Sequence, residues 1–137
     1  MVKPPAPGDA SYDKYTSERN AIIQSLTTRS QGLSKTLNSL ENYSCNSADG
    51  AMYVFPSVKL PPKAIAAAEE AGLNPDDYYA EQLLLATGIC VVPGSGFGQA
   101  EGTFHFRTTF LPQEDKMNTV ADSFQTFNAT FMEKYRE

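Results

Sequence analysis

The chain has 137 residues, of which 41% are hydrophobic and 20% charged, and its formal net charge is −5. This length allows one ordinary domain or part of a larger one, and the apolar fraction excludes wholesale disorder. Phosphate neutralisation dominates nucleic-acid affinity, so an acidic chain without a basic cluster is a poor nucleic-acid binder. No apolar stretch approaches the roughly 18 residues of a membrane-spanning helix, and no apolar run follows Lys3 as a signal peptide would require.

A long helix is predicted after a start that is rich in proline and glycine. Apolar residues recur at helical spacing along this segment: Tyr15, Ile22, Leu26, Leu33, Leu37 and Leu40. A helix over about residues 11–40 would be roughly 45 Å long, because each residue adds 1.5 Å. A compact domain of this size has a radius of gyration of only about 14 Å. We therefore expect this helix to span two domains, or to lack an element on which it once packed.

Short strands and helices are predicted over the rest of the chain. In order, we expect strands at 43–48 and 51–58 around a turn at 47–50, helices at 63–71 and 76–86, a buried strand at 89–92, a loop at 93–98, a strand at 103–111, and a helix after residue 112. Residues 51–56 are apolar on both faces, as a fully buried strand would be. A long helix, a small sheet and covering helices indicate an α/β domain.

The strand at 103–111 carries the charged residue that most invites a functional interpretation. Alternation of side chains puts Phe104, Phe106 and Phe110 on a core face, and His105 and Arg107 on the opposite face. A guanidinium on a stiff strand needs an anionic partner if it is buried. Two interpretations stay open on this evidence. Arg107 is either a structural ion-pair or exposed edge residue, or a bidentate clamp for the carboxylate of a substrate.

Other reactive side chains give weaker signals. His105 is the only histidine, and core packing or a hydrogen bond explains it better than general-base catalysis. Cys45 and Cys90 are too few and too far apart for a metal cluster or a redox pair, and we expect both to be buried or half-buried free thiols. Acidic residues at helix ends, such as Asp76 and Asp77, are interpreted as solvated complements of the helix dipole.

Neither the lysines nor the glycine loop indicates a cofactor site within this chain. None of the seven lysines looks desolvated, which a Schiff-base lysine must be. The loop at 93–98 contains clustered glycines, but no Gly-Lys-Ser/Thr follows and no helix opens behind it, so the phosphate-loop interpretation is weak. Clustered glycines indicate instead a backbone that approaches closely beside a site.

Two neighbouring motifs together resemble a known family. Residues 87–99 read TGICVVPGSGFGQ and residues 102–108 read GTFHFRT. These runs resemble the C-terminal signature of alanine aminotransferases. The wider pattern, Pro-Gly-x-x-Phe-Gly, then a glycine and an arginine five residues on, is typical of fold-type I aminotransferases that depend on pyridoxal phosphate. Further matches lie at 1–12, at 50–56, and at the Leu-Pro pairs 60–61 and 111–112, so the resemblance covers essentially the entire chain.

The resemblance implies a domain organisation and one site residue. Residues 1–40 would be a linker and a long interdomain helix, and residues 41–137 the C-terminal small domain of the fold-type I enzymes. Arg107 would be the small-domain arginine that binds the α-carboxylate of the amino- or 2-oxo-acid substrate. The glycine loop would shape the site entrance. Closure of the small domain would carry Arg107 inward and exclude water.

The departures from the family are as informative as the matches. In the family, the cofactor lysine, the phosphate-binding residues and the acid that pairs with the pyridine nitrogen lie upstream, in the large domain. None has a counterpart here, so pyridoxal phosphate would be bound by that large domain, and the chain alone is predicted to be inactive. We therefore interpret the chain as the C-terminal part of an aminotransferase, with no catalytic residue, cofactor ligand or metal site of its own.

The resemblance also implies a reaction and a setting for the whole enzyme. It would exchange the amino group of L-alanine with 2-oxoglutarate, giving pyruvate and L-glutamate. Glutamate–glyoxylate transamination is one alternative, and a non-catalytic fragment that serves as an interaction or assembly subunit is another. The full-length enzyme would be a homodimer that binds neither nucleic acid nor membrane. We expect it in the cytoplasm, with the mitochondrion or the peroxisome as alternatives.

Overall fold

The computed structural model describes residues 3–136, so Met1, Val2 and Glu137 lie outside the described part of the chain. Its α-helices are α1 (Tyr12–Asn38), α2 (Pro62–Glu70), α3 (Pro75–Thr87) and α4 (Glu114–Tyr135). Its strands are β1 (Tyr43–Ser44), β2 (Tyr53–Val54), β3 (Ser57–Val58), β4 (Val92–Pro93) and β5 (Phe106–Thr109), and a 3₁₀ turn, η1, covers Gly94–Phe97. The predicted combination of a long helix, a small sheet and covering helices is confirmed.

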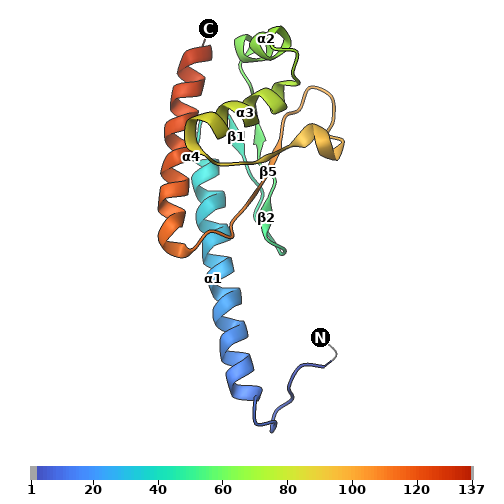
Figure 1. The fold of residues 1–137 in the computed structure, drawn as a ribbon, viewed down its shortest axis with the longest axis vertical. Coiled ribbons are helices and arrows are strands. Elements are labelled where there is room, and N and C mark those ends of the chain that lie inside the picture. Colours follow the sequence, from blue (N-terminus) through green and yellow to red (C-terminus); the bar gives the residue numbers. More distant parts are fainter. Residues whose placement is uncertain (1–2, 137) are drawn as a thin grey trace.

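The predicted helix over residues 11–40 is observed as α1, but only its second half belongs to the body of the molecule. Figure 1 shows the N-terminal half of α1 projecting below the other elements, while α4 lies alongside the C-terminal half. The buried residues of α1, among them Leu33 and Leu37, all lie at or after Ser30. By contrast, Ile22 and Ile23 have exposed fractions of 60% and 52%. Within residues 3–136, Ile22 and Ile23 on the projecting half are therefore largely left to solvent.

The central strand of the sheet is β5. It pairs antiparallel with β2 on one side and with β4 on the other, so that Tyr53 lies opposite Thr109 and Val92 lies opposite Arg107. The strands β1 and β3 form a separate antiparallel pair, which an isolated bridge between Ser57 and His105 joins to the start of β5. Each regular strand is shorter than predicted, but β5 lies within the expected 103–111 segment.

Of the predicted strands 43–48 and 51–58, the first is observed as β1 and pairs with β3 at the end of the second, but the second strand is not continuous. The second segment breaks at Pro56 into β2 and β3, which pair with different strands. Proline has no N–H to donate, so one continuous ladder cannot run through it. The carbonyl of Pro56 instead accepts a hydrogen bond from the N–H of Phe106 at 3.2 Å, which turns the chain between the two pairings.

The expectation that residues 51–56 are buried on both faces is also wrong. Val54 and Pro56 are buried, whereas Tyr53 and Phe55 are exposed, with fractions of 41% and 44%. The sequence is apolar on both faces because one face of the segment packs in the core, while the other presents aromatic rings at the surface. The exposed rings of Tyr53 and Phe55 belong to the candidate site described below.

The core lies where the buried face of β5 meets α3 and α4. Phe106 stacks on Phe124 with ring centroids 6.0 Å apart, and on Tyr79 at the same distance. Phe110 is buried as predicted, while Phe104 is half-buried. The hydroxyl groups of Tyr43 and Tyr79 contact each other, and burial raises the pKa of both well above its usual range. These two tyrosines therefore stay protonated and serve the core.

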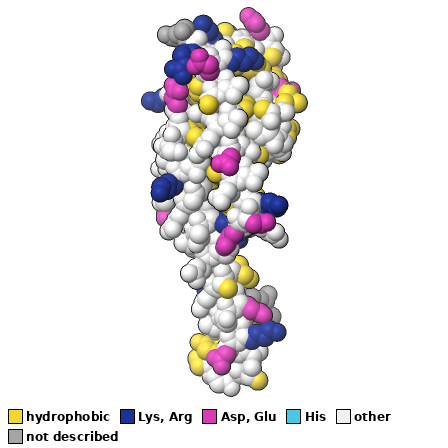
Figure 2. Space-filling model, turned by 90° about the vertical axis from the view of Figure 1, so that its left-hand side faces the viewer, with side chains coloured by type: hydrophobic (Ala, Val, Ile, Leu, Met, Phe, Trp, Pro, Cys, Tyr) yellow, Lys and Arg dark blue, Asp and Glu magenta, His cyan; other side chains and the backbone are white. Residues whose placement is uncertain are grey.

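Cys45 is buried and Cys90 is exposed, and both are free thiols. The expectation of burial is thus right for Cys45 and wrong for Cys90, because the predicted buried strand at 89–92 is reduced to β4, which begins at Val92. On the face that Figure 2 shows, acidic and basic side chains are scattered, and neither sign forms a block. Within residues 3–136, no helix combines the length and the hydropathy needed to cross a bilayer.

Candidate functional site

Arg107 lies on the face of β5 that the core leaves open. Along β5 the side chains alternate between buried Phe106 and Thr108 and half-buried Arg107 and Thr109. This alternation matches the predicted assignment of faces, and it follows from the two-residue period of a strand. Because β5 is paired on both sides, the backbone beneath Arg107 is fixed by two ladders. The position of its guanidinium is therefore set by the rigid centre of the sheet.

Two aromatic rings flank the Arg107 guanidinium. Its Cζ lies 4.6 Å from the ring centroid of Tyr53 and 4.8 Å from that of Phe97. Tyr53 is opposite Thr109 in the ladder and so is a diagonal neighbour of Arg107, which is the spacing at which long side chains meet across a sheet. Phe97 reaches the guanidinium from η1. Both contacts are favourable because the negative faces of the rings attract a cation.

Within residues 3–136, no acidic side chain pairs with Arg107. Among residues 3–136 its guanidinium forms no ion pair and no hydrogen bond, whereas Arg136 pairs with Glu41 and Glu133, and Arg29 donates to three backbone carbonyls. The structural ion-pair interpretation is therefore not supported by the described residues. A half-buried arginine whose N–H groups are free can bind an external carboxylate with its planar fork.

The other rings on this face form a small platform beside Arg107. Phe55 stacks on the His105 imidazole, with centroids 5.1 Å apart and planes within 2°, and it meets Phe97 edge-on at 5.6 Å. His105 also lies 3.2 Å from the Gln99 amide oxygen through its Nδ1. His105 is thus packed and hydrogen-bonded, which is the role that the sequence favoured for it. It supports the platform.

The glycine loop comes close to β5 at its first glycine. The Gly94 N–H donates to the His105 carbonyl oxygen at 2.7 Å. A Cβ at Gly94 would lie 2.8 Å from that oxygen and 2.9 Å from the His105 Cβ, and would also strike the Gln99 amide oxygen. Only glycine fits there, which confirms the predicted close backbone approach. The loop ends at Gly98, whose φ of +74° is in the left-handed region that favours glycine.

Asp76 is the residue of this region that sequence reasoning missed. It was expected to be a solvated acid at a helix start, but its exposed fraction is 3%. Its Oδ2 accepts hydrogen bonds from the Ser95 N–H at 2.7 Å and from the Gln99 Nε2 at 3.1 Å. These partners are 19 and 23 residues away in sequence, so no local pattern could have revealed them.

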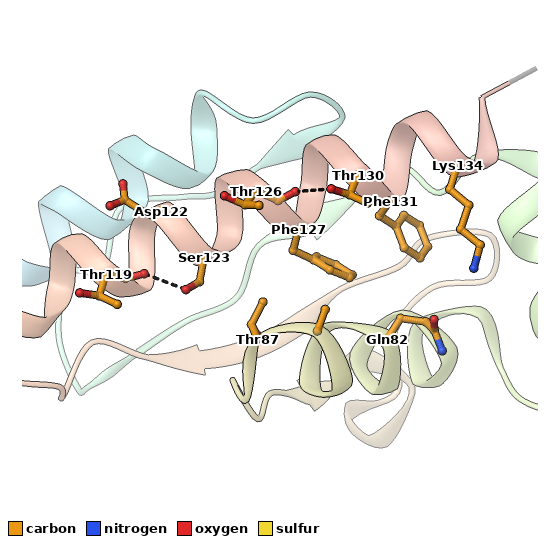
Figure 3. Close-up of a pocket in the computed structure, with 11 residues that line it drawn as sticks. Gln82, Thr87, Thr119, Asp122, Ser123, Thr126, Phe127, Thr130, Phe131 and Lys134 are labelled. Atoms are coloured by element: carbon orange, nitrogen blue, oxygen red, sulfur yellow. Dashed lines mark hydrogen bonds between the residues drawn. The ribbon is translucent and has the colours of Figure 1, made fainter.

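A separate groove lies between α3 and α4. It has a volume of about 580 Å³, and Figure 3 shows Phe127 and Phe131 pointing from α4 toward α3 across it. The Ser123 and Thr130 hydroxyls donate to carbonyls of their own helix, those of Thr119 and Thr126. None of the residues predicted for the site lines this groove.

The described residues do not form a cofactor or metal site. Every lysine between residues 3 and 136 is exposed, so none occupies the apolar pocket that a Schiff-base lysine needs. Within the same residues, no three side chains of His, Cys, Asp or Glu gather in a way that could bind a metal ion. Among the described residues, Arg107 is the side chain that the sequence singled out and whose surroundings leave its N–H groups available.

Comparison with known proteins identifies relatives of this chain. The chain is 52% identical over 136 residues to the mitochondrial alanine aminotransferase 2 of Arabidopsis thaliana, a match that covers 99% of this chain and 25% of the relative. It is 53% identical over 137 residues to glutamate–glyoxylate aminotransferase 2 of the same plant, covering 100% of this chain and 28% of that protein. Human alanine aminotransferase 1 is 44% identical over 135 residues, with 98% and 27% covered. No protein-family model matches the chain.

Solved structures agree with these relatives. The alanine aminotransferase of Pyrococcus furiosus superposes with a TM-score of 0.67 and 27% identity, over 85% of this chain and 26% of that one. An aminotransferase from Escherichia coli superposes with a TM-score of 0.62 and 22% identity, over 78% and 24%. The resemblance inferred from the motifs is confirmed: the chain is homologous to alanine aminotransferases and spans about a quarter of the length of the relatives it matches.

Proposed function

We propose that this chain is the carboxylate-binding part of a pyridoxal-phosphate-dependent aminotransferase. In this proposal Arg107 binds the α-carboxylate of the amino-acid and 2-oxo-acid substrates. The observation that supports it most directly is a half-buried guanidinium that has no ion-pair partner in the described part of the chain and is flanked by Tyr53 and Phe97. A substrate carboxylate would supply the missing negative charge through two parallel N–H···O bonds.

The surroundings of Arg107 favour such a bond. The rings of Tyr53 and Phe97 take up the space around the guanidinium that water would otherwise fill, and Coulomb attraction strengthens where water is excluded. The same rings restrict the guanidinium to few orientations, so less side-chain entropy is lost when a carboxylate binds. The contribution of this chain to catalysis is therefore to bind and orient one end of the substrate.

The reaction we assign to the whole enzyme is transamination between L-alanine and 2-oxoglutarate. All amino acids and 2-oxo acids share the α-carboxylate, so Arg107 would bind both substrates alike and would not select between side chains. A second candidate, glutamate–glyoxylate transamination, is favoured by the 53% identity to an enzyme of that name. Residues outside this chain would decide between them.

The cofactor belongs to residues outside this chain. Pyridoxal phosphate supplies the electron sink for transamination in the family that the chain resembles. The described residues do not fit it, because all their lysines are exposed, and we assign no step to it here. We propose that a large domain in the remaining three quarters of such an enzyme binds the cofactor, and that the full-length protein is a homodimer.

The domain organisation is proposed on the same grounds. Residues 1–40 would form a linker and an interdomain helix, and residues 41–137 the small domain. The exposed Ile22 and Ile23, on the projecting half of α1, are suited to contact with a large domain. For location we propose the cytoplasm. Two relatives that carry the word mitochondrial in their names make the mitochondrion the main alternative.

A chimera tests the proposed function. This chain would replace the matching segment of the Arabidopsis thaliana alanine aminotransferase 2, and alanine transamination would be measured. We expect the chimera to be active, and Arg107→Lys to lower kcat/KM roughly 10- to 100-fold, because a charged hydrogen bond contributes about 1.5–3 kcal/mol. Lysine keeps the charge but lacks the bidentate fork.

The matched control is Arg136→Lys, which changes an exposed arginine at the end of α4 that forms only surface ion pairs. Such pairs contribute little, so kcat/KM should be unchanged. A folded chimera without activity would contradict the proposed function. An Arg107→Lys variant with the same kcat/KM as Arg136→Lys would contradict the role of Arg107.

A further inference from the structure

We infer that Asp76 is a positioning residue for Arg107, acting through Gln99 and the glycine loop. The inference rests on the proposed function, in which Arg107 binds the substrate carboxylate. Asp76 lies in the first turn of α3, and it contacts neither Arg107 nor the rings that flank it. What connects it to the site is a chain of hydrogen bonds that ends on both sides of Phe97.

The first step is the burial of Asp76. Asp76 has an exposed fraction of only 3%, and among residues 3–136 it forms no ion pair. A buried carboxylate is costly unless hydrogen bonds and dipoles compensate it. The N-terminus of α3 supplies the dipole, and both side-chain hydrogen bonds come from the loop, from the Ser95 N–H and the Gln99 Nε2. The acid therefore ties the loop to α3.

The second step is the Gln99 side chain, which uses both ends of its amide. Its Nε2 donates to Asp76, and its Oε1 accepts the His105 backbone N–H at 3.0 Å. His105 comes directly before the strand β5 that carries Arg107, two positions earlier in the chain. Gln99 thus joins α3 to β5 and fixes the end of the loop on the strand.

The third step is the position of Phe97 between two fixed points. The loop begins at Gly94, whose N–H donates to the His105 carbonyl, and its other end is fixed by Gln99. Between them η1 turns the Phe97 ring over the Arg107 guanidinium, at 4.8 Å from Cζ. If Asp76 no longer accepts the hydrogen bonds from Ser95 and Gln99, the segment between these two residues is no longer held to α3, and it relaxes. The Phe97 ring then leaves the guanidinium, which remains in contact with Tyr53 alone.

Proton NMR on the 137-residue chain tests this directly. A ring stacked over a guanidinium shifts the Arg107 Nε–H resonance by its ring current. The variant Phe97→Leu removes that ring and provides the reference shift. We expect Asp76→Asn, which keeps the shape but removes the charge, to move the Arg107 resonance toward this reference. The control Asp77→Asn removes a charge from the same helical turn without touching the loop and should leave the resonance unchanged. Resonances of the core ring Phe124 report that the fold is intact.

A second variant covers the case in which Asp76→Asn does not fold. Gln99→Met keeps the length of the side chain and removes both amide bonds, and we expect the same direction of shift. In the chimera, Asp76→Asn should raise KM for alanine and for 2-oxoglutarate roughly two- to fivefold, the factor expected for one lost exposed cation–π contact, with kcat less affected. General destabilisation would not produce this split.

The outcomes separate this inference from the proposed function. An Arg107 resonance that stays at its wild-type position in folded Asp76→Asn and Gln99→Met overturns the inference, whatever Arg107→Lys does to activity. A resonance that moves, together with kinetics that neither Asp76→Asn nor Arg107→Lys changes, supports the coupling from Asp76 to Arg107 and overturns the proposed function.

Discussion

Gly94 shows how much of the candidate site depends on the absence of one side chain. The loop backbone meets β5 there, and a Cβ would lie 2.8 Å from the His105 carbonyl oxygen. Two residues further along, a Cβ at Gly96 would have no atom within 4 Å, and the φ of Gly96 is outside the left-handed region. The two glycines belong to one 3₁₀ turn, so they separate the effect of close approach from that of glycine flexibility.

The variants Gly94→Ala and Gly96→Ala should therefore behave differently. Gly94→Ala forces the loop away from the strand, and we expect it to lower the free energy of unfolding by about 1–3 kcal/mol, as overpacking does. Gly96→Ala should be neutral or slightly stabilising, because it only restricts the unfolded chain. Urea denaturation followed by circular dichroism measures both. Equal losses in the two variants would mean that the close approach at Gly94 does not exist.

At the scale of elements, α1 has one half in the core and one half outside it. Leu33 and Leu37 are buried against the body of the molecule. Ile22 belongs to the same apolar stripe, about three turns before Leu33, yet it is exposed. The stripe is continuous in sequence because a helix repeats its faces regardless of what covers them. The length of the helix, not the pattern itself, indicated that part of it reaches beyond the domain.

This division predicts the effect of two substitutions of the same kind. Leu37→Ala removes a fully buried side chain, and we expect it to reduce the free energy of unfolding by about 2–5 kcal/mol. For Ile22→Ala we expect a change within about 0.5 kcal/mol, because the side chain is largely solvated. Thermal unfolding of the 137-residue chain compares them. A loss at Ile22 as large as that at Leu37 would show that the projecting half of α1 packs against something in solution.

The helices could be predicted from the sequence, and the pairing of the strands could not. Apolar spacing and the residues Gly88 and Pro112 located the helices to within a few residues, because these signals act locally. Strand pairing depends on partners far away, and Pro56 divides one apparent strand between two of them. Alternation did predict the face of Arg107. The burial of Asp76 could not be predicted from the sequence, since it depends on a loop 19 or more residues away.

At the scale of the whole molecule, this chain would provide one wall of the binding site proposed above. It spans about a quarter of the length of the relatives that it matches. It carries an arginine that no acid among residues 3–136 neutralises, an aromatic platform, and a loop tied to α3. The cofactor and the catalytic groups would come from the remaining three quarters. Arg107 is thus the point at which this chain would meet the substrate.

The most direct measurement removes the carboxylate from the substrate and the guanidinium from the enzyme together. In the chimera, kcat/KM is compared for L-alanine and L-alaninamide, with Arg107 present and with Arg107→Gln. If Arg107 binds the carboxylate, the preference for the acid over the amide falls about tenfold or more in the variant, because the two changes remove one interaction. A preference that is the same in both proteins would contradict the carboxylate-binding role of Arg107.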